Sequence, residues 1–376
     1  MAERFGRYSA AAGAKLVWIH AVSVGEARAA APLVQALRAA LPDHALLLTC
    51  TTAAGRDTLR QIHGATALVT YLPYDLPGAV RRFLAHWQPR LGVLMETEVW
   101  PNLLAACVSH GIPVLLANAR MSEKSARGYA RWPALGRAMF GSLAQVCAQS
   151  TADAERLRAL GAREVEVTGN LKFDVEPDPA QLAAGRAWRE RVGRPVLLLA
   201  STREGEEELL LREIRQGDAF LTVVVPRHPQ RFDEVAQSAD VRRTRQALPD
   251  KSARVYLGDT MGEMAFYYAG CDVAVIGGSF LPLGGQNLIE ALASGAPVVT
   301  GPSMFNFAEA TRLALEAGAA IQTRDAGEAL AQAKQLLGDR ARRAEMTAAG
   351  RRLCELHRGA TERHLAVCRR LLSARG

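Results

Sequence analysis

The amino-acid sequence predicts an α/β protein with two doubly wound parallel sheets. Apolar runs of strand length alternate with alanine-rich stretches of helical period from one end of the chain to the other, as is typical of a parallel sheet wrapped by helices. The alternation is interrupted at residues 170–181, which hold two prolines and three acidic side chains. A chain of 376 residues is long enough for a full core on either side of that interruption.

Seven apolar runs precede the interruption and predict the strands of a first Rossmann-like domain. They lie at residues 16–22, 45–50, 67–71, 91–95, 114–117, 145–148 and 165–168. The helical stretches between them include residues 27–40 and 53–63. We place this N-terminal domain at residues 1–172 and a linker at residues 173–185.

The pattern restarts after the linker and predicts a second Rossmann-like domain at residues 186–352. Its strands are expected at residues 195–200, 220–225, 253–257, 273–276 and 298–300. Long helices are predicted at residues 326–337 and 341–372, and residues 353–376 are expected to pack back toward the first domain. Two such domains would face each other across a cleft at the carboxyl ends of the strands, where open α/β sheets bind ligands.

The composition excludes several classes of protein. Half of the residues are apolar and about a fifth are charged, as in an ordinary soluble globular protein, and no apolar run approaches the roughly 20 residues of a membrane span. The first 15 residues lack the apolar core of a signal peptide. We therefore expect a cytoplasmic protein, or an anchored one whose anchor this chain lacks.

The net charge and the cysteines of the chain indicate which molecules and metals it can bind. A net charge of +8 favours acidic partners such as nucleic acid, anionic lipid or phosphorylated small molecules. The chain lacks an aromatic and basic module of the kind that binds single strands, so we expect no nucleic acid partner. The six cysteines are scattered without metal-ligand spacing, which predicts reduced thiols and no metal site.

Residues 272–301 predict a nucleotide-binding loop between a strand and a helix. An apolar strand is followed by two glycine pairs, and Asn287 is placed to cap a helix that carries Glu290 and ends near Gly295. Backbone amides at such a turn favour phosphate, and the carboxylate can bind ribose hydroxyls. A glycine-rich turn without a ligand is the alternative.

The first domain offers carboxylates at two strand ends. Glu26 is expected in the first turn of a helix that follows the first strand, where the positive helix end would hold it ionised as a general base. A purely helix-stabilising role is the alternative, and His20 on the preceding strand is expected to be a core histidine. Glu96 and Glu98 follow another strand and are expected to point the same way from an extended segment. Lys172 lies where the domain ends and could meet a phosphate or carboxylate.

The second domain offers cations at its strand ends. Arg203, Arg227 and His228 each follow an apolar strand, where a nucleotide phosphate would lie. Gly262 and Glu263, after a further strand, could present amides and a carboxylate to a base or sugar. Each position alone is weak, but together these positions favour a nucleotide site over packing.

Residues 124–140 interleave basic and aromatic side chains. Arg127 and Arg131 stand near Trp132 in a stretch with helical period. Such a segment suits a membrane surface or an anionic amphiphile. A helix with buried aromatic residues and solvated arginines is the alternative.

The motifs taken together resemble those of the 3-deoxy-D-manno-octulosonic acid (Kdo) transferases of Gram-negative bacteria. In order along the chain they are HAVSVGE, METEVWPN, GNLKFD, ASTREGEEE, PRHPQRF, LGDTMGEM and the run GGSF…GGQN…E. The resemblance covers nearly the whole chain. It implies a glycosyltransferase-B fold and an inverting transfer of Kdo from CMP-Kdo, without metal or other cofactor, to the tetra-acylated precursor of lipid A. It also implies a place at the cytoplasmic face of the inner membrane, normally through an N-terminal anchor.

The resemblance assigns residues by motif. Glu26 is the implied base, with Glu98 and Lys172 as active-site partners. The implied CMP-binding set is Ser201, Arg203, Arg227, His228, Gly262, Glu263, Met264, Gly278, Ser279, Asn287 and Glu290. We expect Ser23, Gly25 and Glu96 to bind the acceptor, together with Arg127 and Arg131 of the basic and aromatic segment. Gln286 stands where many members have histidine.

Other functions remain open from the sequence. One is another enzyme of the same architecture, such as a UDP-sugar transferase or a nucleotide-sugar 2-epimerase. A two-domain sugar-binding protein is the alternative outside the enzymes, and it would need no base at Glu26.

Overall fold

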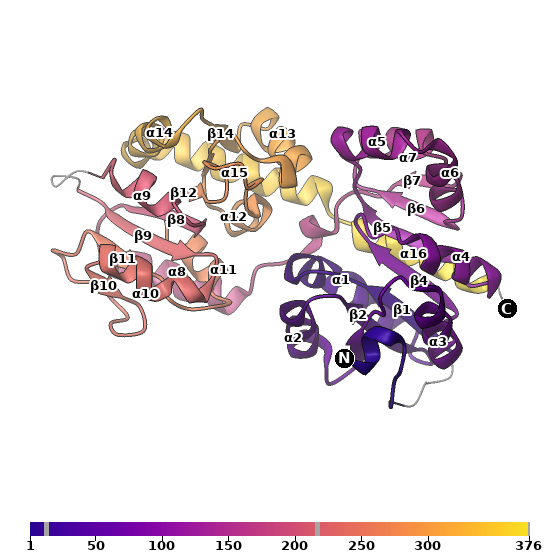
Figure 1. Ribbon diagram of the computed structural model, residues 1–376. Helices are drawn as coiled ribbons and strands as arrows, with labels where there is room; N and C mark the ends of the chain where they lie inside the picture. Colours follow the sequence, from indigo (N-terminus) through magenta and orange to yellow (C-terminus); the bar gives the residue numbers. More distant parts are fainter. Residues whose placement is uncertain (11–14, 215–218, 375–376) are drawn as a thin grey trace. The chain divides into compact units, whose positions relative to one another are not determined.

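The chain forms two compact α/β units (Figure 1). The computed structural model describes residues 1–10, 15–214 and 219–374. Unit 1 comprises Met1–Val175 and His357–Gly376, and unit 2 comprises Glu176–Leu356. Residues 173–185, the predicted linker, include the start of a helix at Pro179.

Unit 1 is built on a seven-stranded, fully parallel sheet in the order β3-β2-β1-β4-β5-β6-β7. Its strands are β1 (Leu16–His20), β2 (Ala45–Cys50), β3 (Leu68–Tyr71), β4 (Leu91–Met95), β5 (Val114–Ala119), β6 (Gln145–Ala148) and β7 (Val165–Val167). All seven predicted strands are present. The order reverses between β1 and β4, and open sheets bind ligands at the carboxyl side of such a switch point.

Helices cover both faces of this sheet. Alternate residues of β1 enter different cores, with Trp18 packed against one set of helices and Ile19 against the other. The first set includes α3 (Pro77–Trp87), α4 (Pro101–Ser109), α6 (Pro133–Phe140) and α7 (Thr151–Ala159). The second set is α1 (Val24–Ala40), α2 (Ala53–His63) and α16 (Ala360–Ser373). The remaining elements of the unit are η1 (Ala2–Phe5), α5 (Glu123–Ala130) and η2 (Leu171–Asp174).

Unit 2 repeats this plan on a second parallel sheet, in the order β10-β11-β9-β8-β12-β13-β14. Its strands are β8 (Val196–Thr202), β9 (Leu221–Pro226), β10 (Val241–Arg242), β11 (Val255–Leu257), β12 (Val273–Ile276), β13 (Val298–Thr300) and β14 (Ala320–Gln322). The sequence prediction missed β10 and β14, which are two and three residues long. Here the order reverses between β8 and β12.

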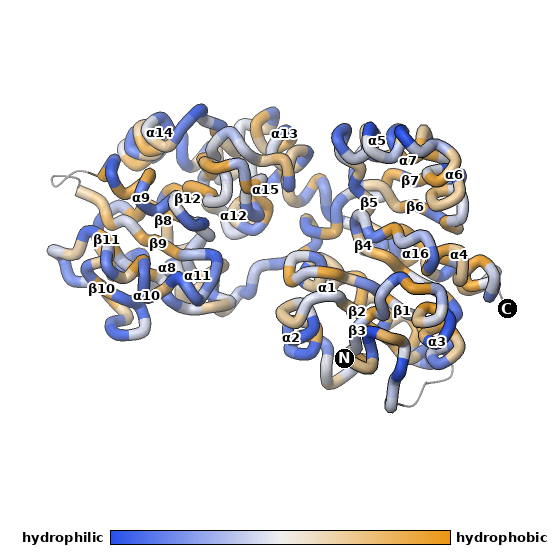
Figure 2. Tube along the Cα trace, viewed as in Figure 1, coloured by the Kyte–Doolittle hydropathy of each residue, from blue (hydrophilic) through white to orange (hydrophobic). Residues whose placement is uncertain are grey.

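The helical elements of unit 2 lie before, between and after its strands. They are α8 (Pro179–Val192), α9 (Glu206–Leu211), η3 (Pro229–Arg231), α10 (Phe232–Val235), η4 (Ala236–Ser238), α11 (Met264–Ala269), α12 (Leu288–Ser294), η5 (Phe305–Phe307), α13 (Ala308–Glu316), α14 (Ala326–Gly338) and α15 (Arg340–His357). Hydrophobic residues concentrate along the strands in the hydropathy view, and hydrophilic residues on loops and outer helix faces (Figure 2). Each unit has buried hydrophobic clusters of its own, and the predicted fold of two doubly wound α/β units is confirmed.

The predicted single helix over residues 341–372 is wrong. Two helices, α15 and α16, occupy this stretch, and Gly359 between them adopts a left-handed conformation with φ of 89°. The Asp174 carboxylate accepts hydrogen bonds from Gly359 N at 2.7 Å and Thr361 N at 2.5 Å. A side chain of unit 1 therefore caps the start of α16, and the helix packs against α1 of that unit.

Candidate functional site

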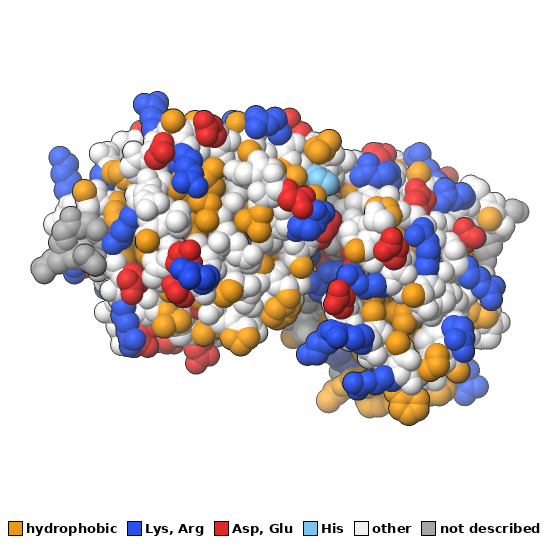
Figure 3. All heavy atoms as spheres, turned by 90° about the horizontal axis from the view of Figure 1, so that it is seen from above, with side chains coloured by type: hydrophobic (Ala, Val, Ile, Leu, Met, Phe, Trp, Pro, Cys, Tyr) orange, Lys and Arg blue, Asp and Glu red, His pale blue; other side chains and the backbone are white. Residues whose placement is uncertain are grey.

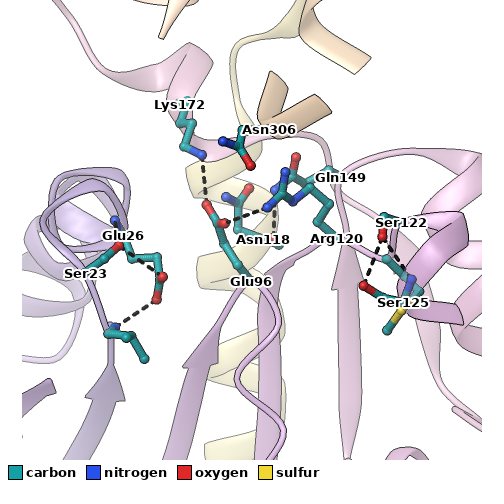
Figure 4. A network of polar contacts seen from close by, with 12 residues as sticks. Ser23, Glu26, Glu96, Asn118, Arg120, Ser122, Ser125, Gln149, Lys172 and Asn306 are labelled. Atoms are coloured by element: carbon teal, nitrogen blue, oxygen red, sulfur yellow. Dashed lines mark hydrogen bonds and ion pairs between the residues drawn. The ribbon is translucent and has the colours of Figure 1, made fainter. Parts of the chain in front are cut away.

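Glu26 lies at the carboxyl end of β1, beside the switch point of unit 1. Ser23 caps α1 by accepting a hydrogen bond from Glu26 N, and the Glu26 carboxylate accepts one from Val22 N at 2.8 Å and one from the Ser23 hydroxyl at 3.1 Å. Figure 4 shows this carboxylate turned back over the start of the helix. The arrangement is a capping box, which fixes the carboxylate in one position.

Burial changes the expected ionisation of Glu26. The helix end was predicted to keep the group ionised, and the hydrogen bonds from Val22 and Ser23 do lower its pKa, but burial outweighs them and raises the pKa to about 7. The nearby Glu96 and Glu98 carboxylates raise it further. A carboxyl with a pKa near neutrality is well suited to general base catalysis.

A second capping box in the chain provides a comparison. Glu328 in the first turn of α14 accepts a hydrogen bond from Arg324 N, and Asp325 caps the same helix. There the pKa of the glutamate is lowered, by the backbone and side chain of Arg324. Capping alone therefore does not account for Glu26, whose environment is set by burial beside other carboxylates.

Glu96 and Glu98 follow β4 on the other side of the switch point. The segment is a turn and not the extended stretch that was predicted, because Glu96 adopts a left-handed φ of 55° and Glu98 N donates to Met95 O. The two carboxylates consequently have different partners, with Glu98 accepting a hydrogen bond from Trp100 Nε1 at 3.0 Å. Burial raises the pKa of Glu98.

Lys172 and Arg120 both approach the buried Glu96 carboxylate (Figure 4). The Lys172 ammonium lies 2.8 Å from Oε1, and an Arg120 guanidinium nitrogen lies 4.0 Å from Oε2. Lys172 is thus part of the carboxylate cluster of unit 1 and not an isolated solvated lysine of a linker.

Asn118, near the carboxyl end of β5, connects this cluster to the C-terminal helix. Its side-chain oxygen accepts a hydrogen bond from Leu171 N at 3.0 Å, next to Lys172, and its own N–H donates to His364 Nε2 at 2.9 Å. The backbone of Asn118 is left-handed, with φ of 52°, which asparagine tolerates better than most residues. The sequence reasoning missed this residue and Arg120, although both follow a predicted strand end, where polar side chains could have been considered.

His20 is a core residue, as predicted. It is completely buried, its Nδ1 lies 2.9 Å from the Thr49 hydroxyl, and burial lowers its pKa to about 4.

In unit 2, the glycine loop after β12 is held by Glu206, a residue that the sequence reasoning missed. Its buried carboxylate accepts hydrogen bonds from Gly278 N at 2.6 Å and Phe280 N at 2.9 Å, and from Arg203 N at 2.9 Å. Arg203 follows β8, so Glu206 joins the two strand ends on either side of the switch point. Glu206 lies three residues after Arg203, at a helix start of the capping type, and this spacing could have identified it from the sequence.

The rest of the loop agrees with the predicted strand, loop and helix. Asn287 caps α12 by accepting a hydrogen bond from Ile289 N, and the helix ends at the left-handed Gly295. Ser279 is fully buried, and its hydroxyl donates to Ile276 O and accepts from Gly301 N. Ser279 therefore shapes the loop through its side chain. Glu290 is in the first turn of α12 as expected.

Arg203, Arg227 and His228 gather at the carboxyl ends of β8 and β9. Burial lowers the pKa of His228, and the positive charges of Arg203, Arg227 and Arg231 lower it further. Arg231 is paired with the buried Glu207 at 2.7 Å. The cations at these strand ends give this part of the unit a local excess of positive charge, which favours an anion.

The remaining predicted nucleotide residues lie around the start of α11. Glu263 pairs with Arg243 at 2.7 Å, which lowers the pKa of the carboxyl, and Gly262 adopts a left-handed φ of 80°. Met264 begins α11, and its sulfur lies 4.0 Å from the Ser201 hydroxyl at the end of β8. The predicted set of unit 2 thus follows three neighbouring strands, β8, β9 and β11, and the adjacent β12.

Residues 124–140, the basic and aromatic segment, agree in part with each of the two interpretations of the sequence, a surface for an amphiphile and a helix with buried aromatic residues. Phe140 is in the core of unit 1 and packs edge-to-face on Tyr129, whereas Trp132 is 71% exposed and Leu135 is 49% exposed. Arg127 and Arg131 are also exposed. Burial raises the pKa of Tyr129, and the charge of the Glu98 carboxylate raises it further.

Acidic and basic side chains are interspersed over the face drawn in Figure 3. All six cysteines are free, as predicted. Within residues 1–10, 15–214 and 219–374, no group of three or more His, Cys, Asp or Glu side chains could hold a metal ion. In the same ranges, no helix combines the length and apolar character needed to cross a membrane.

Solved structures show the same fold at low sequence identity. HepE from Anabaena in complex with UDP is 16% identical and aligns with a TM-score of 0.63 over 96% of this chain and 100% of that one. The UDP-GlcNAc 2-epimerase from Neisseria meningitidis is 14% identical, with a TM-score of 0.60 over 91% of this chain and 98% of that one. The fold is therefore that of the glycosyltransferase-B class, as predicted.

Sequence comparison identifies the family. Residues 1–175 match the family described as 3-deoxy-D-manno-octulosonic-acid transferase (kdotransferase). The 3-deoxy-D-manno-octulosonic acid transferase of Bordetella pertussis is 50% identical, over 96% of this chain and 89% of that protein. The enzyme of the same name from Haemophilus influenzae is 35% identical, over 97% of this chain and 90% of that protein. The chain therefore belongs to the 3-deoxy-D-manno-octulosonic acid transferases, a family of glycosyltransferases.

Proposed function

We propose that this enzyme moves Kdo from CMP-Kdo to a hydroxyl of the tetra-acylated lipid A precursor, with inversion and without a metal ion. The names of its relatives support transfer of this sugar. The acceptor oxygen forms a bond to the anomeric carbon while the bond from that carbon to the CMP phosphate oxygen breaks, and the acceptor proton passes to a base. A single displacement of this kind inverts the anomeric carbon.

The observation that best supports the proposal is the state of Glu26. Its carboxylate is fixed by Val22 N and the Ser23 hydroxyl, and its pKa is raised to about 7. A general base of that pKa is substantially ionised at neutral pH and basic enough to accept a proton from an attacking hydroxyl. We assign Glu26 this role, with Ser23 and Gly25 shaping the acceptor's approach.

We assign the carboxylate cluster around Glu26 to tuning and binding. The charges on Glu96 and Glu98 raise the pKa of the base, and Lys172 moderates this effect by pairing with Glu96. Glu98 is available to hold an acceptor hydroxyl beside the base.

Unit 2 supplies the groups that suit a nucleotide leaving group. The phosphate of CMP gains negative charge as the bond to Kdo breaks, and fixed cations and amides stabilise such charge. The side chains of Arg203 and Arg227 follow the strand ends where this charge would develop. With these donors, the proposed reaction requires no metal ion.

The exposed part of the basic and aromatic segment suits the acceptor and the lipid surface that contains it. Arg127 and Arg131 can meet the acceptor phosphates, and Trp132 can enter the interfacial region of a membrane. We therefore place the enzyme at the cytoplasmic leaflet of the inner membrane.

The test is incubation of the protein with CMP-Kdo and the tetra-acylated precursor, followed by mass spectrometry of the lipid. We expect a mass gain of one or more Kdo residues and release of CMP, with the same rate in the presence of EDTA. Transfer from UDP-sugars in place of CMP-Kdo, epimerisation of a nucleotide sugar, or sugar binding without turnover would each contradict the proposal. Loss of transfer in EDTA, restored by a divalent cation, would contradict the metal-independent mechanism.

A further inference from the structure

An apolar cavity of about 290 Å³ lies within unit 1, at the carboxyl side of its sheet. Its walls include Val22 after β1, Leu72 after β3, Val80 of α3, and Trp100 and Leu103 at the start of α4. The volume is near the lower end of the range for small-molecule pockets, about 300–1,000 Å³. The cavity is large enough for part of a ligand and too small for an acylated disaccharide.

The cavity borders the carboxylate cluster directly. Glu98 forms part of its wall, and Val22, another wall residue, donates its N–H to the Glu26 carboxylate. A ligand group in the cavity therefore belongs to a molecule whose other parts lie beside the proposed base.

Two charged side chains of the wall, Asp75 and Arg4, are engaged with the protein. The Asp75 carboxylate accepts hydrogen bonds from Asn102 N and Leu103 N and so caps α4. The Arg4 guanidinium donates to Thr51 O and lies 4.1 Å from the centre of the Tyr71 ring. A sugar ring needs several directed hydrogen bonds, whereas a hydrocarbon chain needs only apolar wall, which this cavity provides.

An exposed apolar strip continues from the cavity to the surface. Tyr74 lines the cavity and is 48% exposed, Phe5 packs edge-to-face on Tyr74 and is 44% exposed, and Leu76 is 51% exposed. Contiguous exposed apolar side chains are typical of binding surfaces. The strip gives a long apolar ligand a path beyond the enclosed volume.

We infer that this cavity binds the end of one acyl chain of the acceptor, with the chain passing over Phe5, Tyr74 and Leu76. The inference rests on the proposed function, because it assumes an acylated acceptor at Glu26. It assigns the cavity to acceptor recognition: an acyl chain held there places the attached sugar beside the carboxylates. Each methylene buried in the cavity strengthens binding by about fourfold, until the chain fills the space.

The test measures KM for a series of lipid A precursor analogues whose acyl chains are shortened stepwise, in wild type and two variants. For wild type we expect KM to fall by about fourfold for each methylene added to the shortest chain, and then to level off. Val80→Phe adds volume at the wall, so its KM should level off at a shorter chain than in wild type. Tyr74→Asp puts a charge on the exposed strip and should raise KM for long chains by about tenfold or more while sparing short ones.

Val108→Asp is the matched control, because Val108 is exposed on α4 of the same unit and does not line the cavity. It should leave the dependence on chain length as in wild type. A wild-type KM that does not depend on chain length would overturn the inference, as would equal effects of Tyr74→Asp on long and short chains. Failure of the proposed function looks different, because wild type would then transfer Kdo to none of the analogues.

Discussion

The ammonium of Lys172 lies 2.8 Å from the carboxylate of Glu96, although 76 positions separate the two residues in the chain. The contact joins η2 to the turn after β4, beside the switch point of the first sheet. Both side chains are largely withdrawn from solvent, so each depends on the other for compensation of its charge. Arg120 at 4.0 Å is a second, weaker partner of Glu96.

Replacing Lys172 with methionine should therefore reduce both stability and transfer. The change removes the nearer of the two cations at a buried carboxylate, and we expect a loss of about 1.5–3 kcal/mol in the free energy of unfolding, measured with urea. The double variant Glu96→Gln/Lys172→Met removes both charges and should lose less than the sum of the single variants. Additive losses would mean that the pair contributes no coupling energy.

Replacing Glu26 with glutamine should abolish transfer and spare the nucleotide site. Glutamine keeps an oxygen acceptor for Val22 N but cannot take up a proton, and a general base contributes about 10²- to 10⁴-fold to a rate. We expect kcat to fall by that factor while calorimetry shows CMP binding as in wild type.

The matched control for this variant is Glu328→Gln, which alters the other capping box, on α14. It should leave kcat unchanged. Retained transfer in Glu26→Gln would rule out the base assignment, and an equal loss in both variants would point to helix capping as the cause.

The raised pKa of Glu26 predicts a pH dependence with a defined sign. A base acts when deprotonated, so kcat/KM should rise with pH through about 7.

The same group affects stability. Because the pKa of Glu26 in the folded protein lies above the ordinary 4.5, its contribution to stability is fully present below pH 4.5 and is lost as the pH rises through 7. Above pH 7, Glu26→Gln should therefore be more stable than wild type, by about 3 kcal/mol at most.

Urea unfolding at pH 5 and pH 8 measures this difference. Glu328→Gln again serves as the control, because the pKa of Glu328 is lowered and its pH dependence has the opposite sign. The assignment of the raised pKa would be wrong if the stability difference between Glu26→Gln and wild type did not grow between the two pH values.

The fold was predictable because local signals and tertiary structure agree. Strands such as β4 and β12 are continuous apolar runs bounded by turn residues, and parallel strands buried on both faces have that pattern. The missed strands, β10 and β14, read Val-Arg and Ala-Ile-Gln, so neither is a continuous apolar run. The break before α16 was missed because it depends on Asp174, which is 185 positions from Gly359 and invisible to a local pattern.

The sequence was sufficient to locate most residues of the site, but not to predict which residues contact one another. Strand ends located Glu26, Lys172 and Arg203, since polar residues after buried strands lie at one edge of a sheet. The raised pKa of Glu26 was not predicted, because a helix end is a local feature, whereas burial beside Glu96 and Glu98 is a product of the fold. Glu206 was missed for the same reason, as its partners Gly278 and Phe280 come from a distant loop.

Glu206→Gln should weaken nucleotide binding through the glycine loop. The amide nitrogen of glutamine cannot accept a hydrogen bond, so at least one buried N–H among Arg203, Gly278 and Phe280 loses its partner, at a cost of about 1–3 kcal/mol. We expect a lower melting temperature and a raised KM for CMP-Kdo. Glu208→Gln, an exposed change on the same helix, should alter neither quantity. An unchanged KM in a destabilised Glu206→Gln would restrict Glu206 to a purely structural role.

Binding of CMP should raise the pKa of His228. Burial and the charges of Arg203, Arg227 and Arg231 lower that pKa in the free protein, and a bound phosphate would offset the positive field. NMR titration of the His228 ring should show the rise with CMP and no change with cytidine, which has no phosphate. Arg203→Gln should raise the pKa without any nucleotide and reduce the further rise on adding CMP. A His228 pKa that CMP leaves unchanged at saturation would place the phosphate away from the strand ends of β8 and β9.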